Sequence, residues 1–409
     1  CSFPPSQKVA MSNLHQLLTL PQRPVSKDYY LPALTNYLHS GIPATYTLEQ
    51  AAAFENDEEV TDEDSNTTPL HILARSLPRS DALNQEETEA VLSMFDTLFE
   101  YGAGWNFLDY EQKSIGDLLL ERGYGRDNAL YQRVVDAGVS AELLLRKING
   151  GDVEFLEVDE NGNIVVDQET QSPAEQELET EEAQDPDATA ADQTTYLNTK
   201  LEYTDDALVT KDNRDGVMMD WETDIMKLAR DSLFKTNKSD ALVLNIGFGM
   251  GIIDTFIQES HPAKHYICEA HPDVLSRMRQ DGWYDKPNVV VLEGRWQDSL
   301  NRLLDEGTVF FDGIYYDTFS EHYQDMLDLY DVVVGLLKPE GVFSFFNGLG
   351  ADRTICYDVY RRIVELDVAN YGMACTYNTV PLETLPNWEK VKRSYFNCDH
   401  YYHPEISFV

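Results

Sequence analysis

The chain has 409 residues, enough for two or three domains that each bury a core. Its formal net charge is −41 at pH 7, with −11 in residues 1–150, −15 in residues 151–195 and −15 in residues 196–409. Such a surface repels nucleic acid and anionic membranes and attracts a basic partner. We therefore expect no nucleic acid and no membrane among its partners, although solubility alone also explains the charge.

The remaining composition disfavours secreted and membrane-bound classes. No apolar run approaches the roughly 18 residues of a membrane span, and the N-terminus lacks a signal-peptide pattern. Residues 1–10 resemble a tag or extension before Met11. An odd number of widely spaced cysteines without a CxxC pair predicts neither disulfides nor a zinc site, and fits a reducing, intracellular location. These cysteines are Cys1, Cys268, Cys356, Cys375 and Cys398.

The N-terminal region, to about residue 150, is predicted to be all-α and ankyrin-repeat-like. Residues 68–74, TPLHILA, match the signature that begins an ankyrin unit. Residues 98–106 and 114–119 resemble the end of one unit and a degenerate start of the next. An ordinary helical domain is the alternative. In either case we expect His71 to form a hydrogen bond within its own turn, as a structural residue.

Residues 151–192 are predicted to be an acidic, partly disordered linker. They contain no Lys or Arg and are rich in Ser, Pro, Gln and Ala towards their end. Such a composition buries too little apolar surface to offset chain entropy. A short hairpin is predicted within residues 155–166, because Asn161-Gly162 favours a tight turn.

From residue 193 to residue 409, strands and helices alternate, which predicts a doubly wound α/β domain with a largely parallel sheet. The predicted strands are Ala241–Ile246, His265–Cys268, Val289–Leu292, Gly313–Tyr316 and Gly341–Phe346. The predicted helices include Asp254–Ser260, Pro272–Gln280, Asp298–Asp305 and Tyr323–Leu337. Ligands of such Rossmann-like sheets bind at the carboxyl ends of the strands.

A glycine-rich loop, GFGMGI at residues 247–252, follows the first of these strands. Its glycines allow a sharp turn and a close approach to a ligand, and the next helix presents its N-terminal N–H groups. Ile252 stands where the dinucleotide fingerprint needs a third glycine, and no GxxxxGK[ST] loop is present. Alone, the loop indicates only a nucleotide-like ligand.

Residues at the ends of three later strands restrict the class of ligand further. Glu269 is placed to accept both hydroxyls of a ribose, although a solvated strand-end charge is the alternative. Trp296 and Gln297 could hold an adenine ring, and Asp317 follows the fourth predicted strand. This order resembles the layout of an S-adenosylmethionine-dependent methyltransferase.

Three motifs give a more specific resemblance. They are GVMMDWETDIM at residues 216–226, NIGFGMG at 245–251 and FDGIYYDT at 311–318. Residues from about 196 to 409 thereby resemble guanidinoacetate methyltransferase. Together with an ankyrin-like module and an acidic linker, the whole chain resembles the fungal and plant protein arginine N5-methyltransferases, the type IV or delta-N enzymes.

The resemblance implies a cofactor site for S-adenosylmethionine, which leaves as S-adenosylhomocysteine. Tyr196 stands where the small-molecule enzyme has Trp and would help close the pocket. Met218 and Met226 would line the methionine end of the cofactor, although by themselves they would be assigned to the core. The other implied cofactor residues are Gly247, Phe248, Gly249, Met250, Gly251, Ile252, Glu269, Ala270, His271, Trp296, Gln297 and Asp317.

Glu222 and Asp317 are the implied catalytic residues, which would hold the guanidine of the acceptor. A guanidinium and a sulfonium are both cations, and unit charges 4 Å apart repel by roughly 4 kcal/mol at an effective dielectric of 20. Carboxylates offset this repulsion, orient the planar fork and can take the released proton, without a metal. Without the resemblance, Glu222 would be interpreted as an acid on a helix surface. His322, five residues after Asp317, could serve as a general base, but we interpret it as a surface histidine on the next helix. The aromatic residues 394–402 are predicted to form a strand near the sheet edge, or else to shape the mouth of the site.

The resemblance predicts methylation of the delta nitrogen of an arginine in a protein. The partner would be a basic substrate, such as a large-subunit ribosomal protein, and we expect a monomer in the cytoplasm and nucleus. A small-molecule guanidino methyltransferase is the first alternative. A non-catalytic ankyrin adaptor is the second, and the intact Glu222, Asp317 and glycine loop argue against it.

Overall fold

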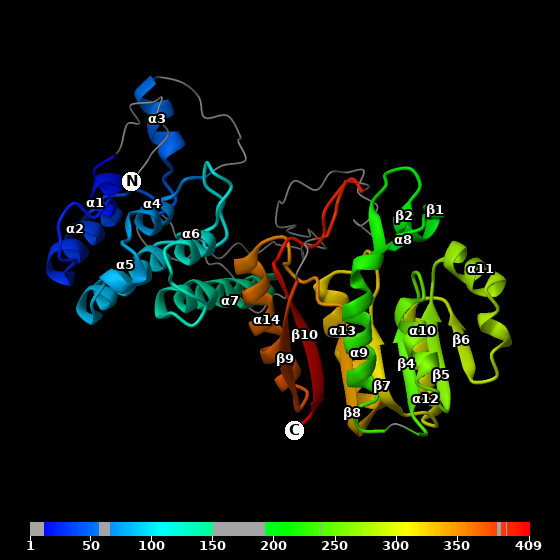
Figure 1. Ribbon diagram of the computed structural model, residues 1–409. Helices are drawn as coiled ribbons and strands as arrows, with labels where there is room; N and C mark the ends of the chain where they lie inside the picture. The colour runs from blue at the N-terminus through cyan, green and yellow to red at the C-terminus, as the bar shows by residue number, and fades with distance from the viewer. Residues whose placement is uncertain (1–11, 57–65, 150–192, 238, 383–385, 390) are drawn as a thin grey trace, which may run out of the picture. The chain divides into compact units, whose positions relative to one another are not determined.

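The structure is a computed structural model that describes most of the chain (Figure 1). The described residues are 12–56, 66–149, 193–237, 239–382, 386–389 and 391–409. The predicted linker at 151–192 and the predicted hairpin at 155–166 therefore lie outside the described residues. Within the described ranges, no helix has the length and apolar character needed to cross a membrane.

The chain divides into two compact units. The first comprises Cys1–Leu178 with Arg353–Val359, and the second comprises Glu179–Asp352 with Tyr360–Val409. The domain limits predicted from the sequence stay predictions. The motifs of the candidate site all belong to the second unit.

The first unit is helical throughout its described N-terminal part. Helix α4 packs on α6, α5 on α7, and α6 on α7, so two helix pairs follow each other along the chain. The elements are α1 (Asn13–Leu18), α2 (Lys27–His39), α3 (Leu48–Asn56), α4 (Pro69–Ser76), η1 (Ser80–Ala82), α5 (Gln85–Glu100), α6 (Ile115–Glu121) and α7 (Ala129–Asn149).

Helices α4 and α6 begin with the same cap. Thr68 and Ser114 are their N-caps, with equal backbone angles (φ −76°, ψ 167°), and each forms a capping box with the third helical residue, His71 or Asp117. The Nδ1 atom of His71 accepts the Thr68 N–H at 3.1 Å, and burial lowers the pKa of His71 to about 4. The structural role predicted for His71 is confirmed. Ser114 follows Thr68 by 46 residues, more than the roughly 33 of an ankyrin repeat, so the ankyrin assignment stays a prediction.

The second unit is built on a mixed sheet of seven strands, in the order β6-β5-β4-β7-β8-β10-β9. All five predicted strands are present in it, and β6, β5, β4, β7 and β8 run parallel to one another, whereas β10 is antiparallel to β8. The strands of this sheet are β4 (Leu242–Ile246), β5 (Lys264–Glu269), β6 (Val289–Glu293), β7 (Phe311–Tyr316), β8 (Leu337–Phe345), β9 (Met373–Pro381) and β10 (His400–Phe408).

The predicted helices of the second unit are also confirmed, and α11 has the predicted bounds. The helices are α8 (Gln193–Asn198), η2 (Asp220–Glu222), α9 (Thr223–Leu233), α10 (Ile252–Glu259), α11 (Pro272–Gln280), η3 (Trp283–Asp285), α12 (Trp296–Glu306), α13 (Tyr323–Leu336) and α14 (Thr354–Ala369). A small antiparallel sheet that the sequence analysis missed precedes α9: β1 (Leu201–Tyr203), β2 (Ala207–Thr210) and β3 (Gly216–Met219).

The C-terminal aromatic residues correct one prediction. The strand β10 begins only at His400, and it is an inner strand, because the antiparallel β9 pairs with it and forms the edge. Residues 394–399 lie outside any strand. The predicted strand at 394–402 is therefore wrong in its start, since only residues 400–402 belong to β10, although β10 does lie near the sheet edge, next to β9. The alternative, that this stretch shapes the mouth of a site, is confirmed at Tyr395, as described below.

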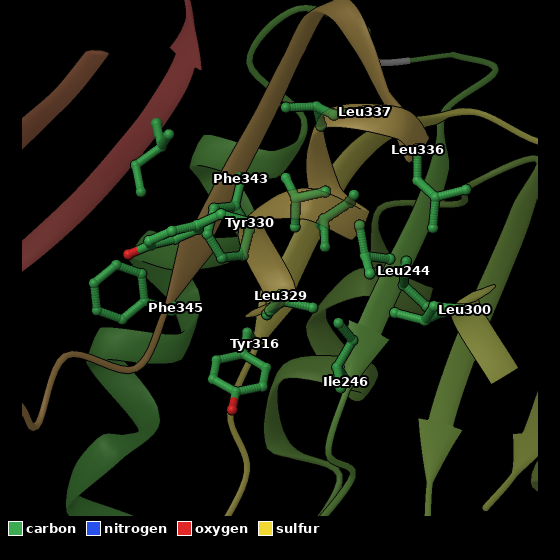
Figure 2. Close-up of a cluster of buried hydrophobic side chains, with 14 of the residues drawn as sticks. Leu244, Ile246, Leu300, Tyr316, Leu329, Tyr330, Leu336, Leu337, Phe343 and Phe345 are labelled. Atoms are coloured by element: carbon green, nitrogen blue, oxygen red, sulfur yellow. The ribbon is translucent and has the colours of Figure 1, made fainter. Parts of the chain in front are cut away.

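The core occupies both faces of the sheet, as Figure 1 shows for the covering helices. Successive residues of a strand point to opposite faces. Val243 thus joins a cluster with α9, α10 and α11, whereas Leu244 joins a cluster with α12, α13 and α14. Figure 2 shows the second cluster, in which Leu244 packs with Leu300 and Leu329. The two layers hold the carboxyl ends of β4, β5, β6 and β7 at one edge.

Candidate functional site

The glycine loop passes so close to its neighbours that its glycines are required by geometry. Gly247 follows β4 with φ +94°, and a Cβ on it would lie 1.8 Å from the carbonyl oxygen of Asp317. Gly249 has φ +54°, and a Cβ there would lie 2.7 Å from the Met218 side chain. Both angles belong to the left-handed region that favours glycine. The loop therefore offers bare backbone to whatever lies beside it.

Buried polar side chains hold the glycine loop in place. The side-chain amide of Asn245 donates to the carbonyl oxygen of Gly247 at 2.8 Å and to Asp254 at 2.9 Å. His265 lies 3.0 Å from the other oxygen of Asp254, and all three side chains are fully buried. The two hydrogen bonds of the Asn245 amide tie the glycine loop to Asp254 in α10.

A cavity of about 560 Å³, which we name the glycine-loop cavity, opens beside Gly247 and Gly249. Besides these two glycines, the residues that line it are Gln193, Tyr196, Val217, Met218, Ile246, Cys268, Glu269, Ala270, Gly294, Arg295, Trp296, Asp317, Thr318, Phe319 and Glu321.

Glu269 ends β5 and also fastens the glycine loop. One of its oxygens accepts the Phe248 N–H at 2.9 Å and the other accepts the His271 N–H at 2.6 Å. Burial raises the pKa of Glu269, and these backbone N–H groups oppose that shift. The N–H groups of Ala270 and Gly249 lower this pKa as well, so Glu269 is held by backbone donors from both the segment after β5 and the glycine loop.

Tyr196 lies over the cavity, where the sequence analysis placed it. Its ring contacts His271 and Phe319, with ring centroids 4.8 and 4.9 Å apart. The Nε2 atom of His271 lies 3.2 Å from the carbonyl oxygen of Tyr196 and 3.1 Å from that of Thr199. His271 thus anchors the segment that carries Tyr196.

The structure separates the predicted cofactor residues into two groups. Tyr196, Met218, Gly247, Gly249, Glu269, Ala270, Trp296 and Asp317 line the glycine-loop cavity. The others stand behind it: Met226 and Phe248 are buried in the core, Met250 donates its N–H to the Met218 sulfur, and Gly251 caps α10. Ile252, His271 and Gln297 are not among the lining residues either.

A second cavity of about 940 Å³, the carboxylate cavity, shares a wall with the first. The shared residues are Val217, Asp317, Thr318, Phe319 and Glu321. The residues that line only the carboxylate cavity are Gly216, Glu222, Tyr316, Ser320, His322, Tyr323, Met326, Phe345, Phe346, Gly348, Leu349 and Tyr395.

Glu222 is buried, with 2% of its surface exposed, which excludes its interpretation as an acid on a helix surface. Its Oε1 atom accepts the Met219 N–H at 3.0 Å and the Tyr395 hydroxyl. Burial and the nearby Asp317 carboxylate raise the pKa of Glu222 well above its ordinary range, and its two hydrogen bonds oppose the shift. Among the described residues, no hydrogen bond occupies Oε2, which is left for a ligand.

Asp317 stands where the two cavities meet. Its backbone N–H donates to the carbonyl oxygen of Ile246 at 2.9 Å, which fixes it beside the glycine loop. Its Oδ2 atom is buried, with no hydrogen-bond partner in the described part of the chain. Burial, and then the charge of Asp254, raise the pKa of Asp317 to about 7. The positive charge of an incoming cation would lower this pKa, so the proton leaves to solvent and the ionised carboxylate pairs with the cation.

Two residues of this region were not singled out from the sequence: Tyr395, which was named only within the stretch 394–402, and Glu321. The Tyr395 hydroxyl orients Glu222 and accepts from the Trp221 indole N–H at 3.2 Å. Burial and Glu222 raise the pKa of Tyr395 well above its ordinary range, so Tyr395 stays a donor. Glu321, with its side chain 4% exposed, lines both cavities. An acidic residue soon after Asp317 was the only local signal for Glu321.

These residues fit a bound S-adenosylmethionine. The glycines allow close contact with backbone, Glu269 lines the cavity at the end of β5, and Asp317, whose Oδ2 atom has no partner among the described residues, lines both cavities. The fold and the site define the class: a Rossmann-like methyltransferase.

Comparisons with known proteins agree with this class. A family model described as guanidinoacetate N-methyltransferase matches residues 191–366. The protein arginine N-methyltransferase 2 of Kluyveromyces lactis is 69% identical over 98% of this chain and all of that protein, and the one from Saccharomyces cerevisiae is 64% identical with the same coverage. The chain belongs to the protein arginine N-methyltransferase 2 family. The solved O-methyltransferase TomG from Streptomyces achromogenes is a distant likeness (17% identity, TM-score 0.33, 47% of this chain and 81% of that chain).

Proposed function

We propose that this enzyme uses S-adenosylmethionine to methylate the delta nitrogen of an arginine in a protein. The observation that carries the proposal is the pair of buried carboxylates, Glu222 and Asp317, in a cavity that shares a wall with the cofactor cavity. S-adenosylmethionine, when bound, supplies the methyl group. The names of the relatives support arginine as the acceptor.

The carboxylate cavity is suited to an arginine side chain. The free oxygens of Glu222 and Asp317 can accept hydrogen bonds from the guanidinium fork and offset its charge beside a sulfonium. Phe346 and Tyr395 add aromatic faces for the guanidinium plane or the aliphatic stem. The carboxylates also fix which nitrogen faces the methyl donor, which is the largest contribution that positioning can make.

The arrangement supports the inner nitrogen as the one that is methylated. Glu222 lines only the carboxylate cavity, whereas Asp317 lines both cavities. Terminal amino groups held by Glu222 would lie away from the donor, and the inner nitrogen would then pass beside Asp317. Asp317, with a pKa near 7, is the base that takes the proton as nitrogen basicity falls.

A guanidino acid is the second candidate, favoured by the match to the guanidinoacetate N-methyltransferase model. Its carboxylate would need a cation or hydrogen-bond donors. Among the described residues that line the carboxylate cavity, none is Lys or Arg, and Glu222, Asp317 and Glu321 would repel an anion. A peptide arginine carries no such carboxylate, so the cavity favours it.

A basic protein, such as a large-subunit ribosomal protein, is the substrate that we propose. The net charge of −41 supports it, because opposite charge speeds encounter. We also propose that the N-terminal helix pairs act as an ankyrin-like docking module, and that the enzyme works as a monomer in the cytoplasm and nucleus.

Labelled S-adenosylmethionine tests the proposal. The enzyme is incubated with guanidinoacetate, or with ribosomal proteins from cells that lack the enzyme, and the products are hydrolysed and separated. We expect label in N5-methylarginine from the proteins. Label in guanidinoacetate alone would exclude the protein substrate, and label in a terminal-nitrogen methylarginine would exclude the delta assignment. An enzyme without any transfer would favour the adaptor.

A further inference from the structure

Glu321 is a buried acid to which no role has been given so far. It lies in the segment between β7 and α13, four residues after Asp317. Its side chain is 4% exposed, and the nearest described cation, an Arg295 nitrogen, lies 3.8 Å away on a side chain that is 41% exposed. A buried carboxylate with so distant a counter-charge is costly unless it is well hydrogen-bonded.

The hydrogen bonds of Glu321 come from both cavities. The Trp296 indole N–H lies 3.0 Å from each of its oxygens, at the start of α12. The Thr318 hydroxyl donates to Oε2 at 2.8 Å, and the Tyr316 hydroxyl donates to the same oxygen. Thr318 and Tyr316 are the two neighbours of Asp317 in the chain. One carboxylate thus joins a wall of the glycine-loop cavity to the segment that presents Asp317.

We propose that Glu321 is a positioning residue that couples the occupancy of the glycine-loop cavity to the placement of Asp317. The proposal rests on the proposed function, since it assumes that the two cavities take the methyl donor and the arginine. A ligand that packs against Trp296 fixes the indole, and the indole fixes Glu321. Glu321 then holds Tyr316 and Thr318 on either side of Asp317.

Charge and geometry both favour this role over simple packing. Three donors from two segments converge on one carboxylate, and bonds to a charged acceptor are roughly twice as strong as neutral ones. A glutamine whose carbonyl replaces Oε2 can still accept from all three donors, but it loses the negative charge and places an N–H₂ group where Oε1 stood, 3.0 Å from the Trp296 N–H, donor against donor. Glu321→Gln therefore disturbs the link while it keeps the volume.

The test measures S-adenosylhomocysteine affinity by calorimetry and steady-state kinetics with an arginine protein for Glu321→Gln. Asp312→Asn is the matched control, because Asp312 is a buried carboxylate at the opposite end of β7 that accepts from the Leu242 N–H and Lys338. We expect Glu321→Gln to weaken S-adenosylhomocysteine binding about tenfold and to lower kcat at saturating substrates by about tenfold or more. Asp312→Asn should change both by less than about twofold, at a similar loss of Tm.

Two results would overturn the proposal: unchanged affinity and kcat in Glu321→Gln, or equal losses in Asp312→Asn. Trp296→Phe and Tyr316→Phe, which keep the carboxylate, decide the matter if Glu321→Gln does not fold. Trp296→Phe should lower kcat even at saturating S-adenosylmethionine, and Tyr316→Phe, at a residue that lines only the carboxylate cavity, should weaken S-adenosylhomocysteine binding. The coupling would be contradicted if each variant changed only the quantity that belongs to the cavity its residue lines, that is, S-adenosylhomocysteine affinity alone or kcat alone. Because the calorimetry needs no acceptor, failure to find an arginine substrate would refute the proposed function and leave the binding result to judge Glu321.

Discussion

The two cavities of the methyltransferase unit are built in different ways. The glycine-loop cavity is formed largely by backbone and by residues that follow consecutive parallel strands, β4, β5, β6 and β7. The carboxylate cavity draws on side chains from β3, η2, the segment after β7, the end of β8 and the stretch around Tyr395. The first depends on turn geometry, and the second depends on distant segments meeting.

Because of this difference, substitutions should impair the two cavities in different ways. Substitutions in the backbone-lined cavity act through space and conformation, so they should lower cofactor affinity and stability together. Substitutions in the carboxylate cavity remove charges or donors, so they should lower catalysis while the cofactor still binds. Asp317 lines both cavities, so a substitution there tests most directly whether catalysis can be lost while the cofactor still binds.

The largest effect is expected for Asp317→Asn. An amide cannot offset the guanidinium charge or take the proton, so kcat/KM for an arginine protein should fall by about 10³-fold. S-adenosylhomocysteine affinity, measured by calorimetry, should change by only a few-fold. A loss of cofactor binding as large as the loss of activity would show that the two cavities are not functionally distinct.

Gly247→Ala should act mainly on cofactor affinity, in contrast to Asp317→Asn. A Cβ 1.8 Å from the Asp317 carbonyl oxygen must displace backbone, so S-adenosylhomocysteine affinity should fall by about 100-fold and stability by about 2–4 kcal/mol. Gly372→Ala is the control, because Gly372 has a similar positive φ, +70°, and no atom within 4 Å of the added Cβ. If both variants lose affinity equally, backbone strain rather than the close approach is the cause.

Tyr395→Phe should affect only the carboxylate cavity. Glu222 loses its side-chain donor, which should lower kcat/KM by about 10- to 30-fold, with S-adenosylhomocysteine affinity unchanged. Tyr315→Phe is a matched control, since the buried hydroxyl of Tyr315 has no hydrogen-bond partner in the described chain. Full activity in Tyr395→Phe would mean that Glu222 is oriented by the Met219 N–H alone.

The smallest effect is a pH dependence that belongs to the carboxylate cavity. Asp317 has a folded-state pKa of about 7, above its ordinary 3.8, so it is protonated below pH 7. Because guanidinium binding needs the carboxylate, kcat/KM should rise about tenfold per pH unit up to about pH 7 and then level. The same raised pKa makes the free energy of unfolding decrease as pH rises from about 4 to 7. A kcat/KM that is flat below pH 7 would contradict this assignment.

The sequence predicted the glycine-loop cavity better than the carboxylate cavity, for a physical reason. An apolar strand followed by a turn that only glycine permits is a local pattern, so β4 and Gly247–Gly251 could be located, and the parallel sheet then placed Glu269 and Asp317 at the same edge. Phe248 and Met226 belong to a core cluster and do not line the glycine-loop cavity, so their cofactor contacts stay predictions. Local spacing does not determine which side of a loop faces a ligand.

Local sequence patterns could not predict the carboxylate cavity. Tyr395 meets Glu222 across 173 residues of sequence, and Trp296 meets Glu321 across 25. The hydrophobic periodicity of a sequence does not indicate contacts between such distant residues. The edge strand β9 was missed because its residues alternate between partly buried and exposed positions and include polar side chains, so it lacks the apolar run that identified the inner strands.

The placement of the tryptophans gives the enzyme built-in optical reporters. Trp296 lines the glycine-loop cavity, Trp221 and Trp388 pack around Tyr395, and Trp283 lies behind Phe248. The fifth, Trp105, belongs to the helical unit. Replacing one indole at a time by phenylalanine would therefore assign intrinsic fluorescence changes to cofactor arrival, arginine arrival or neither. The order in which the two cavities fill could then be followed in real time without any label.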